Sequence, residues 1–220
     1  MYEIEFRGGH RLINSTWRAS VEEAGEYLDP ANEYWGFAFT RHPDGGLAAE
    51  LVGPAPSPRR LVGNAGDQHW GVELRPEVCV AGLPKSEFVG RLVALPITGV
   101  RFMLAGHELR IPEHDGLERF VESLERRDIL RVDPTVRRAL HGDRAGYSTR
   151  SWQRRMKSVT GFSPARIRQL IRARAAYRAL RSGRTATEVA AALGFADQAH
   201  LTRSLVALRA ERPSDIRRLD

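Results

Sequence analysis

The sequence predicts an α+β chain in which a β-rich barrel or sandwich precedes an all-α domain. Short runs of alternating apolar and polar residues, separated by Pro- and Gly-rich turns, fill the first half, and this pattern is typical of small β-sheets. From Asp115 onward the apolar residues recur at helical spacing instead. We therefore expect a β-rich domain at residues 1–114, a helical linker at 115–132 and a helical domain at 133–220.

The expected strands show period-two alternation, for example at 2–6, 68–74 and 99–104. Clusters of Pro, Gly, Asn and Asp separate them and predict turns. One helix is also expected in this half, at 20–28, because Ser20 and Glu23 have the spacing of a capping box.

Capping residues predict the helices of the second half. Asp133 is a favourable N-cap, and Pro134 follows it at the first position of the predicted helix. Polar N-caps and helix-ending glycines then alternate along the chain, with a long helix expected at 164–182, a short one at 185–193 and a final one opened by Pro213. These boundary residues are Ser148, Gly161, Ser163, Gly183, Gly194 and Asp197.

The charge of the chain is divided unevenly between its two halves. Residues 133–220 carry 19 Lys and Arg against 7 Asp and Glu, whereas the rest carries 15 against 20. This asymmetry indicates a polyanionic partner for the helical half. A basic but merely solvated surface is the alternative that charge alone leaves open.

Composition excludes several classes of protein. Cys79 is the only cysteine, so neither an internal disulfide framework nor a cysteine-based zinc site is expected. No apolar run reaches the ~18 residues of a membrane-spanning helix. The first residues lack the basic and apolar regions of a signal peptide, so none is expected there. The single cysteine fits a reducing cytoplasm, where we expect the protein to be located.

Two segments of the helical half share one layout. Each has a turn glycine, a polar cap and then a short helix rich in Gln, Arg and Thr, at 146–157 and at 194–203. A turn followed by such a helix is how a helix-turn-helix presents side chains to the major groove of DNA. We therefore expect two helix-turn-helix units joined by the long helix.

The segment 148–218 resembles the DNA-binding domain of AraC/XylS-type transcriptional regulators. The matching stretches are 152–164, 172–176 and 188–203, the last of which includes Gly-Phe-Ala-Asp-Gln-Ala-His-Leu-Thr-Arg. A weaker likeness covers Tyr34-Trp35, His-Pro-Asp-Gly at 42–45 and 71–76, which resemble the short cupin-like domain of some of these regulators.

The resemblance implies a cupin-like N-terminal domain for sensing or dimerisation, and two helix-turn-helix units that read successive major-groove faces. A helix at 164–182 would be about 28 Å long at ~1.5 Å per residue, which is close to the ~34 Å between such faces. The implied partner is double-stranded DNA. RNA polymerase and a small-molecule effector are further candidates, the chain is expected to be a nucleoid-associated monomer or homodimer, and no membrane or cofactor is implied.

Two departures from the family pattern are visible. His141 and Gly142 stand where the second unit has Val189 and Ala190, so the first unit is expected to be shortened. Near the end, 209–212 lacks the family's glycine before Pro213, and a distorted turn is expected there.

The spacing within the two reading helices assigns roles to their side chains. Arg154 and Arg203 are expected to read guanine, and Gln153 can pair with adenine in the same bidentate way. Lys157 and the residues near helix N-termini are better placed for phosphate. The full DNA-binding set is Ser148, Thr149, Arg150, Gln153, Arg154, Lys157, Arg184, Thr187, Gln198, Ala199, His200, Thr202 and Arg203.

Within that set, Ala199 suits a thymine methyl group. His200 has two interpretations, a base contact or a residue that caps and packs its own helix.

The N-terminal aromatics also have two interpretations. Trp35, Phe37 and Trp70 could line a ligand pocket inside the barrel, or they could fill its core. No His-x-His pair with a following Glu is present, so no metal site is expected. The sequence contains no recognisable Ser/His/Asp motif and no phosphate-binding loop of the G-x-x-x-x-G-K type, so no catalytic residue is assigned.

The sequence therefore predicts a sequence-specific transcriptional regulator rather than an enzyme. One alternative is a cupin-like enzyme or ligand-binding protein with a vestigial helical domain. Another is a nucleoid-type DNA binder without site preference.

Overall fold

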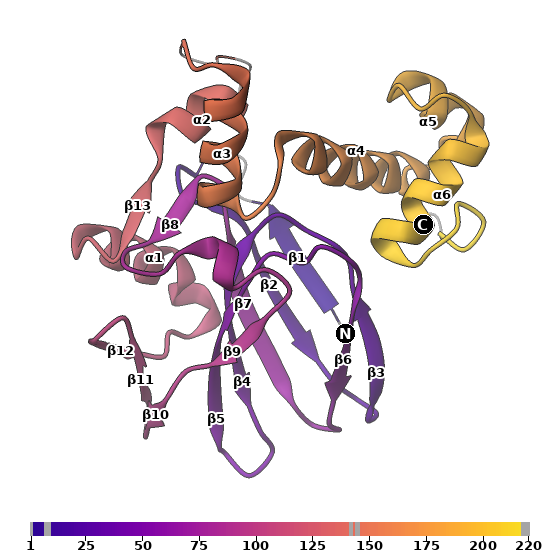
Figure 1. Cartoon of the computed structure of the whole chain (residues 1–220). Helices are drawn as coiled ribbons and strands as arrows, with labels where there is room; N and C mark the ends of the chain where they lie inside the picture. The colour runs from indigo at the N-terminus through magenta and orange to yellow at the C-terminus, as the bar shows by residue number, and fades with distance from the viewer. Residues whose placement is uncertain (1, 7–9, 141–142, 144–145, 217–220) are drawn as a thin grey trace.

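The protein is described by a computed structural model that covers residues 2–6, 10–140, 143 and 146–216 (Figure 1). The N-terminal part is β-rich and the C-terminal part is helical, which confirms the predicted α+β class. The strands are β1 (Tyr2–Phe6), β2 (Ile13–Ser20), β3 (Gly25–Asp29), β4 (Trp35–Arg41), β5 (Leu47–Val52), β6 (Arg59–Gly63), β7 (Gln68–Leu74), β8 (Val78–Val80), β9 (Leu92–Ala94), β10 (Ile97–Thr98), β11 (Arg101–Leu104), β12 (His107–Arg110) and β13 (Leu130–Val132).

The main sheet has six strands in the order β1-β2-β7-β4-β5-β9, and every pairing in it is antiparallel. Smaller sheets are formed by β3 with β6, by β10 to β12, and by β8 with β13. Gly71 on β7 allows the tightest approach in the main sheet, since an added Cβ would lie 2.4 Å from the Phe37 carbonyl oxygen and 2.6 Å from the Trp17 ring. A larger residue at this position would push the strands apart.

The N-terminal core lies on one face of this sheet. Alternate residues of β4, namely Trp35, Phe37 and Phe39, point inward and are at most 1% exposed. Helix α1 (Leu117–Arg126) covers them with its apolar face, and the Phe120 ring meets Phe37 edge to face at 5.5 Å between centroids. Since α1 and β13 both pack into this core, the expected helical linker at 115–132 contains a strand and is attached to the N-terminal part.

The helices that follow enclose a second apolar core. It is lined by Trp152, Met156, Leu170, Val189 and Leu201, each at most 5% exposed. The helices are α2 (Pro134–Leu140), α3 (Thr149–Thr160), α4 (Pro164–Arg181), α5 (Ala186–Ala192) and α6 (Gln198–Arg209), and two short 3-10 helices, η1 (Lys85–Glu87) and η2 (His114–Gly116), lie in the N-terminal part.

Two predicted helices are wrong. The chain at 20–28 forms the end of β2 and then β3, because β3 pairs with β6 over its whole length from Gly25 opposite Gly63 to Asp29 opposite Arg59. The final helix is not formed at 213–216, where the chain makes a turn and the Asp215 amide donates to the Arg212 carbonyl at 2.9 Å, and residues 217–220 lie outside the described residues. Ile216 follows the turn and is buried against the second core.

The helical part contains two helix-turn-helix units, which we call the first unit (α2 and α3) and the second unit (α5 and α6). Both have a helix of seven residues followed by one of twelve, so the expected shortening of the first unit is absent from its helices. The units differ in their connection, which spans 141–148 in the first and 193–197 in the second. His141 and Gly142, on which the expectation rested, lie outside the described residues.

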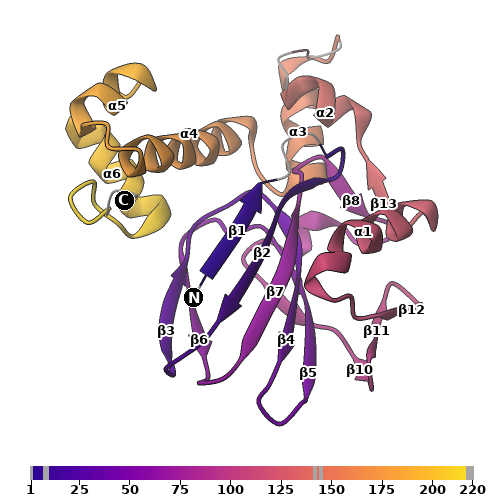
Figure 2. The ribbon, with the colours of Figure 1, turned by 180° about the vertical axis from the view of Figure 1, so that it is seen from behind.

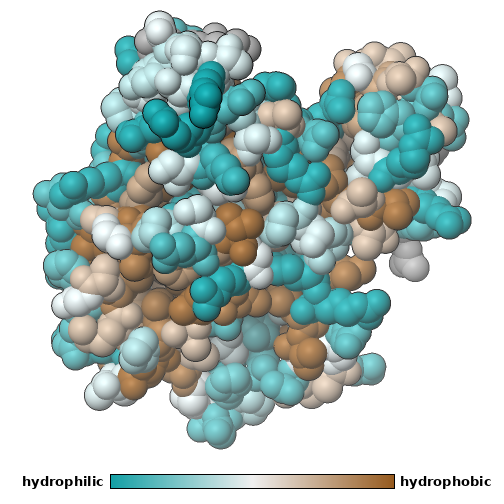
Figure 3. Space-filling view, in the orientation of Figure 1, coloured by the Kyte–Doolittle hydropathy of each residue, from teal (hydrophilic) through white to brown (hydrophobic). Residues whose placement is uncertain are grey.

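Helix α4 runs between the two units, with α3 at one end and α6 at the other in both views (Figures 1 and 2). Figure 3 shows the units as separate lobes with a hollow between them and with hydrophilic residues on their outer surfaces. Among the described residues, no helix combines the length and apolar character needed to cross a membrane.

Candidate nucleic-acid interface

Helix α3, the predicted reading helix of the first unit, has well-defined ends. The Ser148 hydroxyl accepts a hydrogen bond from the Ser151 amide at 3.2 Å, as expected for an N-cap. Gly161 ends the helix in the left-handed conformation, with φ of 81°. Ser163 then caps α4, and Pro164 stands at its first turn. These predicted boundaries are confirmed.

The reading helix of the second unit, α6, is fixed by an Asp cap. The Asp197 carboxylate accepts from the His200 amide at 2.5 Å. Before it, α5 begins with a complete capping box, in which Thr185 and Glu188 each accept from the other's amide. The carboxyl pKa of Glu188 is lowered by its hydrogen bond from the Thr185 amide. Gly194, with φ of 67°, makes the turn between the helices.

The predicted reading face of the first unit is accessible. Arg150, Gln153, Arg154 and Lys157 are all exposed along α3, and none of their side chains makes a hydrogen bond or ion pair with the described residues. Trp152 on the opposite side is only 5% exposed, so the helix has a packed face and an open cationic face. Groups that lack internal partners remain available to an external polyanion.

The predicted reading face of the second unit is accessible as well. Gln198, Ala199 and Arg203 are exposed, and Arg203 likewise makes no ion pair within the described chain. Thr202 is half-buried, and its hydroxyl donates to the Gln198 carbonyl at 3.0 Å within the helix. The Thr202 hydroxyl is therefore already engaged, whereas the Gln198 amide is not.

His200 has a structural role in the turn before α6. Its Nδ1 accepts from the Ala196 amide at 3.3 Å, and its ring lies edge to face on Phe195 at 5.4 Å. In the neutral ring the proton is therefore on Nε2, which is left as a donor.

The remaining residues of the predicted set lie at helix starts. Ser148 and Thr149 are exposed at the N-terminus of α3, and Arg184 and Thr187 are exposed around the start of α5. The 18 residues of α4 make it about 27 Å long at ~1.5 Å per residue, which sets the scale of the separation between the units.

The first unit rests on the N-terminal part through η1. An added Cβ on Gly161 would lie 2.5 Å from Cγ2 of Val89, just after η1, so the end of α3 and this loop are in close contact. Asp133, which caps α2 through the Val136 amide, also forms an ion pair with Arg155 of α3. Beneath α3, the Lys85 ammonium is buried and donates to the Pro76 carbonyl at 2.8 Å.

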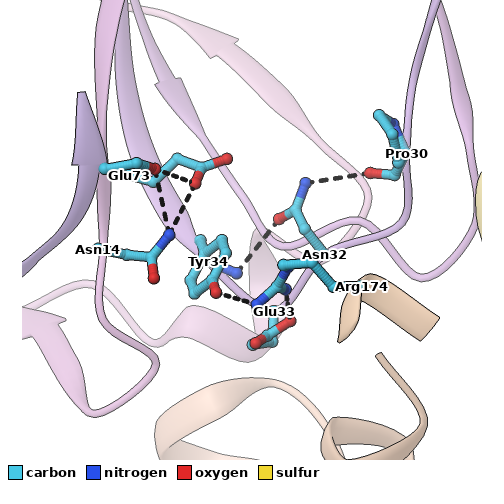
Figure 4. A network of polar contacts seen from close by, with 8 residues as sticks. Asn14, Pro30, Asn32, Glu33, Tyr34, Glu73 and Arg174 are labelled. Atoms are coloured by element: carbon cyan, nitrogen blue, oxygen red, sulfur yellow. Dashed lines mark hydrogen bonds and ion pairs between the residues drawn. The ribbon is translucent and has the colours of Figure 1, made fainter. Parts of the chain in front are cut away.

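The second unit is tied to the N-terminal part through α4 (Figure 4). The Arg174 guanidinium donates to the Glu33 carboxylate at 2.6 Å and to the Tyr34 hydroxyl, and it stacks 4.4 Å from the centre of the Tyr34 ring. Glu33 is 1% exposed, so Arg174 neutralises a buried charge. The neighbouring Ala31 amide donates to the Leu208 carbonyl of α6 at 2.8 Å.

Burial raises the pKa of the Tyr34 hydroxyl, and the negative charge of Glu33 raises it further. Burial also raises the carboxyl pKa of Glu73, which lies on β7 beside this network, although hydrogen bonds from Ser15 and Asn14 oppose that shift. Glu73 of β7 and Arg174 of α4 thus belong to one polar cluster, which lies where the N-terminal part meets the helical part.

The three residues predicted for ligand binding lie in the N-terminal core. Trp35 packs on Phe88 at 5.4 Å and under the Lys85 ammonium, and the Trp70 indole nitrogen donates to the Pro112 carbonyl at 2.8 Å. Phe37 is fully buried. Two surface clefts stand out in the described part of the chain, and neither is lined by these rings.

The sequence reasoning missed two groups of residues. Glu33, Tyr34 and Arg174 gave no local signal, because their contact joins positions about 140 residues apart. Arg166 and Arg172 of α4 line a cleft against α6 together with Gln169. Their regular spacing of three along a helix was a visible signal of one shared face.

The comparison with protein families agrees with the two helix-turn-helix units. Residues 142–219 match the family model described as a helix-turn-helix domain, of the AraC type. No curated protein matches the chain significantly. Among solved structures, the chain is similar to ToxT from Vibrio cholerae O395, with a TM-score of 0.43 and 11% identity over 97% of this chain and 95% of that one.

A second structure of ToxT from the same strain, bound to (E)-4-(8-methylnaphthalen-1-yl)but-3-enoic acid, gives a TM-score of 0.44 and 8% identity over 97% of both chains. A likeness at this level carries no information about individual residues or ligands.

Proposed function

We propose, from the premise that residues 142–219 form an AraC-type helix-turn-helix domain, that the chain is a sequence-specific DNA-binding transcriptional regulator. In this proposal α3 and α6 enter adjacent segments of the major groove, while α4 sets their spacing. The observation that carries it is the pair of exposed reading faces on α3 and α6, whose cationic side chains Arg150, Arg154, Lys157 and Arg203 have no internal ion-pair partners among the described residues.

The chemistry of these faces supports base reading. Arg154 and Arg203 offer guanidinium forks that match the two acceptors of guanine, and Gln153 and Gln198 offer amides that match adenine. Ala199 adds a methyl group for thymine contact. Lys157 presents a point charge, which suits a phosphate.

The helix starts would hold the DNA backbone. Helix N-termini attract phosphate because their amides and the helix dipole favour negative charge. Ser148 and Thr149 would serve α3 in this way, and Arg184 and Thr187 would serve the second unit. These contacts would orient the protein without specifying sequence.

The N-terminal part would regulate the DNA-binding part, either through an effector or by dimerisation. Its contacts with the first unit through η1, with α4 through Glu33 and Tyr34, and with α6 through the Ala31 amide support such a coupling. Its aromatic interior is packed, so a small-molecule effector would have to bind at a surface cleft or displace core rings.

The experiment compares Arg154→Ala, Arg203→Ala and Lys157→Ala on a cognate duplex and on a scrambled duplex. We expect each arginine variant to lose about 1–3 kcal/mol of binding free energy on the cognate duplex and much less on the scrambled one. Lys157→Ala should weaken both duplexes alike. Equal losses on both duplexes for the two arginine variants would remove the reading role from these residues.

A further inference from the structure

A cleft of about 210 Å³ lies between α4 and α6, on the flank of the second reading helix. Its polar lining consists of Arg166, Gln169, Arg172, His200, Arg203 and Ser204. Every one of these side chains can donate a hydrogen bond, and no Asp or Glu contributes to the lining. A site with three guanidinium groups and no carboxylate favours an anion.

The donors are held in place by contacts with the protein. The Arg172 guanidinium stacks 4.5 Å from the centre of the Phe195 ring and donates to the Gly194 carbonyl at 3.1 Å. His200 uses Nδ1 to accept from the Ala196 amide, so that Nε2–H is the free donor of its neutral ring. Fixed donors lose little conformational entropy when a ligand binds.

The position of the cleft identifies the anion. His200 and Ser204 each follow a proposed reading residue, Ala199 and Arg203, by one position, which places them ~100° further round α6. A helix seated in the major groove, which is ~12 Å wide, has a sugar–phosphate strand along each flank. The cleft therefore faces the place where one strand of the duplex would pass.

We propose that this cleft seats a phosphate of the DNA backbone, with Arg172 as its principal ligand and Gln169 and His200 as additional donors. The inference rests on the proposed function and adds α4 to the DNA-contacting surface of the second unit. Arg166 lies at the edge of the cleft, where it also donates to the Pro56 carbonyl of the N-terminal part. Arg203 lies between the cleft and the reading face.

The test uses the full chain and a set of duplexes in which single phosphates around the second half-site are replaced by neutral methylphosphonates. Wild-type protein is compared with Arg172→Gln, and with Arg168→Gln as a matched control, because Arg168 is exposed on the same helix outside the cleft. At one linkage, we expect the replacement to weaken the wild type and the control about fivefold or more but to leave Arg172→Gln unaffected. The slope of log affinity against log salt should fall by ~0.9 in Arg172→Gln alone.

Gln169→Glu provides a second variant, because Gln169 is exposed and its replacement removes no packing. We expect a carboxylate there to weaken binding about tenfold on cognate and scrambled duplexes alike. The phosphate assignment would be overturned if every methylphosphonate weakened Arg172→Gln by the same factor as the wild type. An unchanged affinity of Gln169→Glu for duplex DNA would overturn it as well. Wild-type protein that binds no duplex would instead overturn the proposed function.

Inorganic phosphate alone separates the two sources of the anion. We expect it to shift the His200 ring signals only weakly at millimolar concentration. Two results together would overturn the backbone assignment and show a site for free anions. They are tight binding of inorganic phosphate that is lost in Arg172→Gln, and the same effect of every methylphosphonate on the wild type and on Arg172→Gln.

Discussion

The first and second units have helices of equal length but are supported differently. The first unit leans on the N-terminal part, since α3 packs on the loop around η1 and Arg155 pairs with Asp133 at the domain boundary. The second unit is braced mainly by α4, whose Arg172 stacks on Phe195 and whose Tyr177 ring lies 3.6 Å from the Arg209 guanidinium of α6. One reading helix therefore takes its position from the neighbouring N-terminal part, and the other takes it from α4.

The two units also end their reading helices differently. Gly161 takes the left-handed position after α3, whereas Ala210 takes it after α6, with φ of 57°. The segment 209–212, where the resemblance led us to expect a glycine, thus has an alanine in a conformation that favours glycine. The turn keeps its left-handed geometry with a less suitable residue.

The largest effect is expected where α4 is attached to the N-terminal part. Arg174→Gln leaves the buried Glu33 carboxylate without its cation, and we expect it to lower the free energy of unfolding by about 3 kcal/mol, as for other broken buried pairs. Hydrogen exchange of the Ala31 amide, which bonds to α6, should become faster. Urea unfolding and amide exchange measure the two effects.

Arg168→Gln is the control for that substitution, with an expected change within about 0.5 kcal/mol, as for most surface substitutions. Unchanged protection of Ala31 in Arg174→Gln would show that the second unit does not depend on this attachment.

A smaller effect should distinguish the glycines of the two units. Gly161→Ala combines left-handed strain with a 2.5 Å approach to Val89, and we expect a loss of about 2 kcal/mol. Gly194→Ala has the strain alone, since an added Cβ there meets nothing within 4 Å, and we expect about 1 kcal/mol. Unfolding followed by circular dichroism tests the pair. Equal losses of unfolding free energy in the two variants would mean that Val89 moves away from the added methyl group at no energetic cost.

The last effect is a pH dependence of stability, and it concerns the loop under the first unit. Burial lowers the pKa of Lys85 to about 7 from its ordinary value of 10.5. Between these values the unfolded chain binds more protons than the folded one, so Lys85 makes stability rise with pH. From pH 7 to pH 9 the rise should be about 2 kcal/mol, and Lys85→Met should lack it.

The measurement for Lys85 is urea unfolding followed by tryptophan fluorescence. The four tryptophans are Trp17, Trp35, Trp70 and Trp152, so the signal reports the N-terminal part and the first unit but not the second. A pH dependence that is the same in Lys85→Met and in the wild type would assign it to other groups.

The features that the sequence predicted correctly are those with local causes. The caps at Ser148, Ser163 and Asp197 each depend on a hydrogen bond to an amide three residues ahead, so the pattern is visible in the sequence itself. The reading faces follow from helical spacing in the same way. Their role in DNA binding stays a prediction.

The features that it missed depend on distant partners. The capping-box spacing at Ser20 could not reveal that the following residues pair with β6. Likewise, nothing near residue 130 indicated that β13 would pair with β8, about fifty positions earlier. The attachment of α4 through Arg174 to Glu33 belongs to the same class.

Selection of binding sites from a random pool of duplexes, with the full chain at low salt, shows whether α3 and α6 both read DNA. Two reading helices at the ends of α4 should enrich a bipartite motif, whose two specified segments have centres about one helical turn apart, ~10 base pairs. Arg203→Ala should relax only the segment read by the second unit. The proposed function would be contradicted by a pool that shows no enrichment. It would also be contradicted by a single short segment that neither Arg154→Ala nor Arg203→Ala changes.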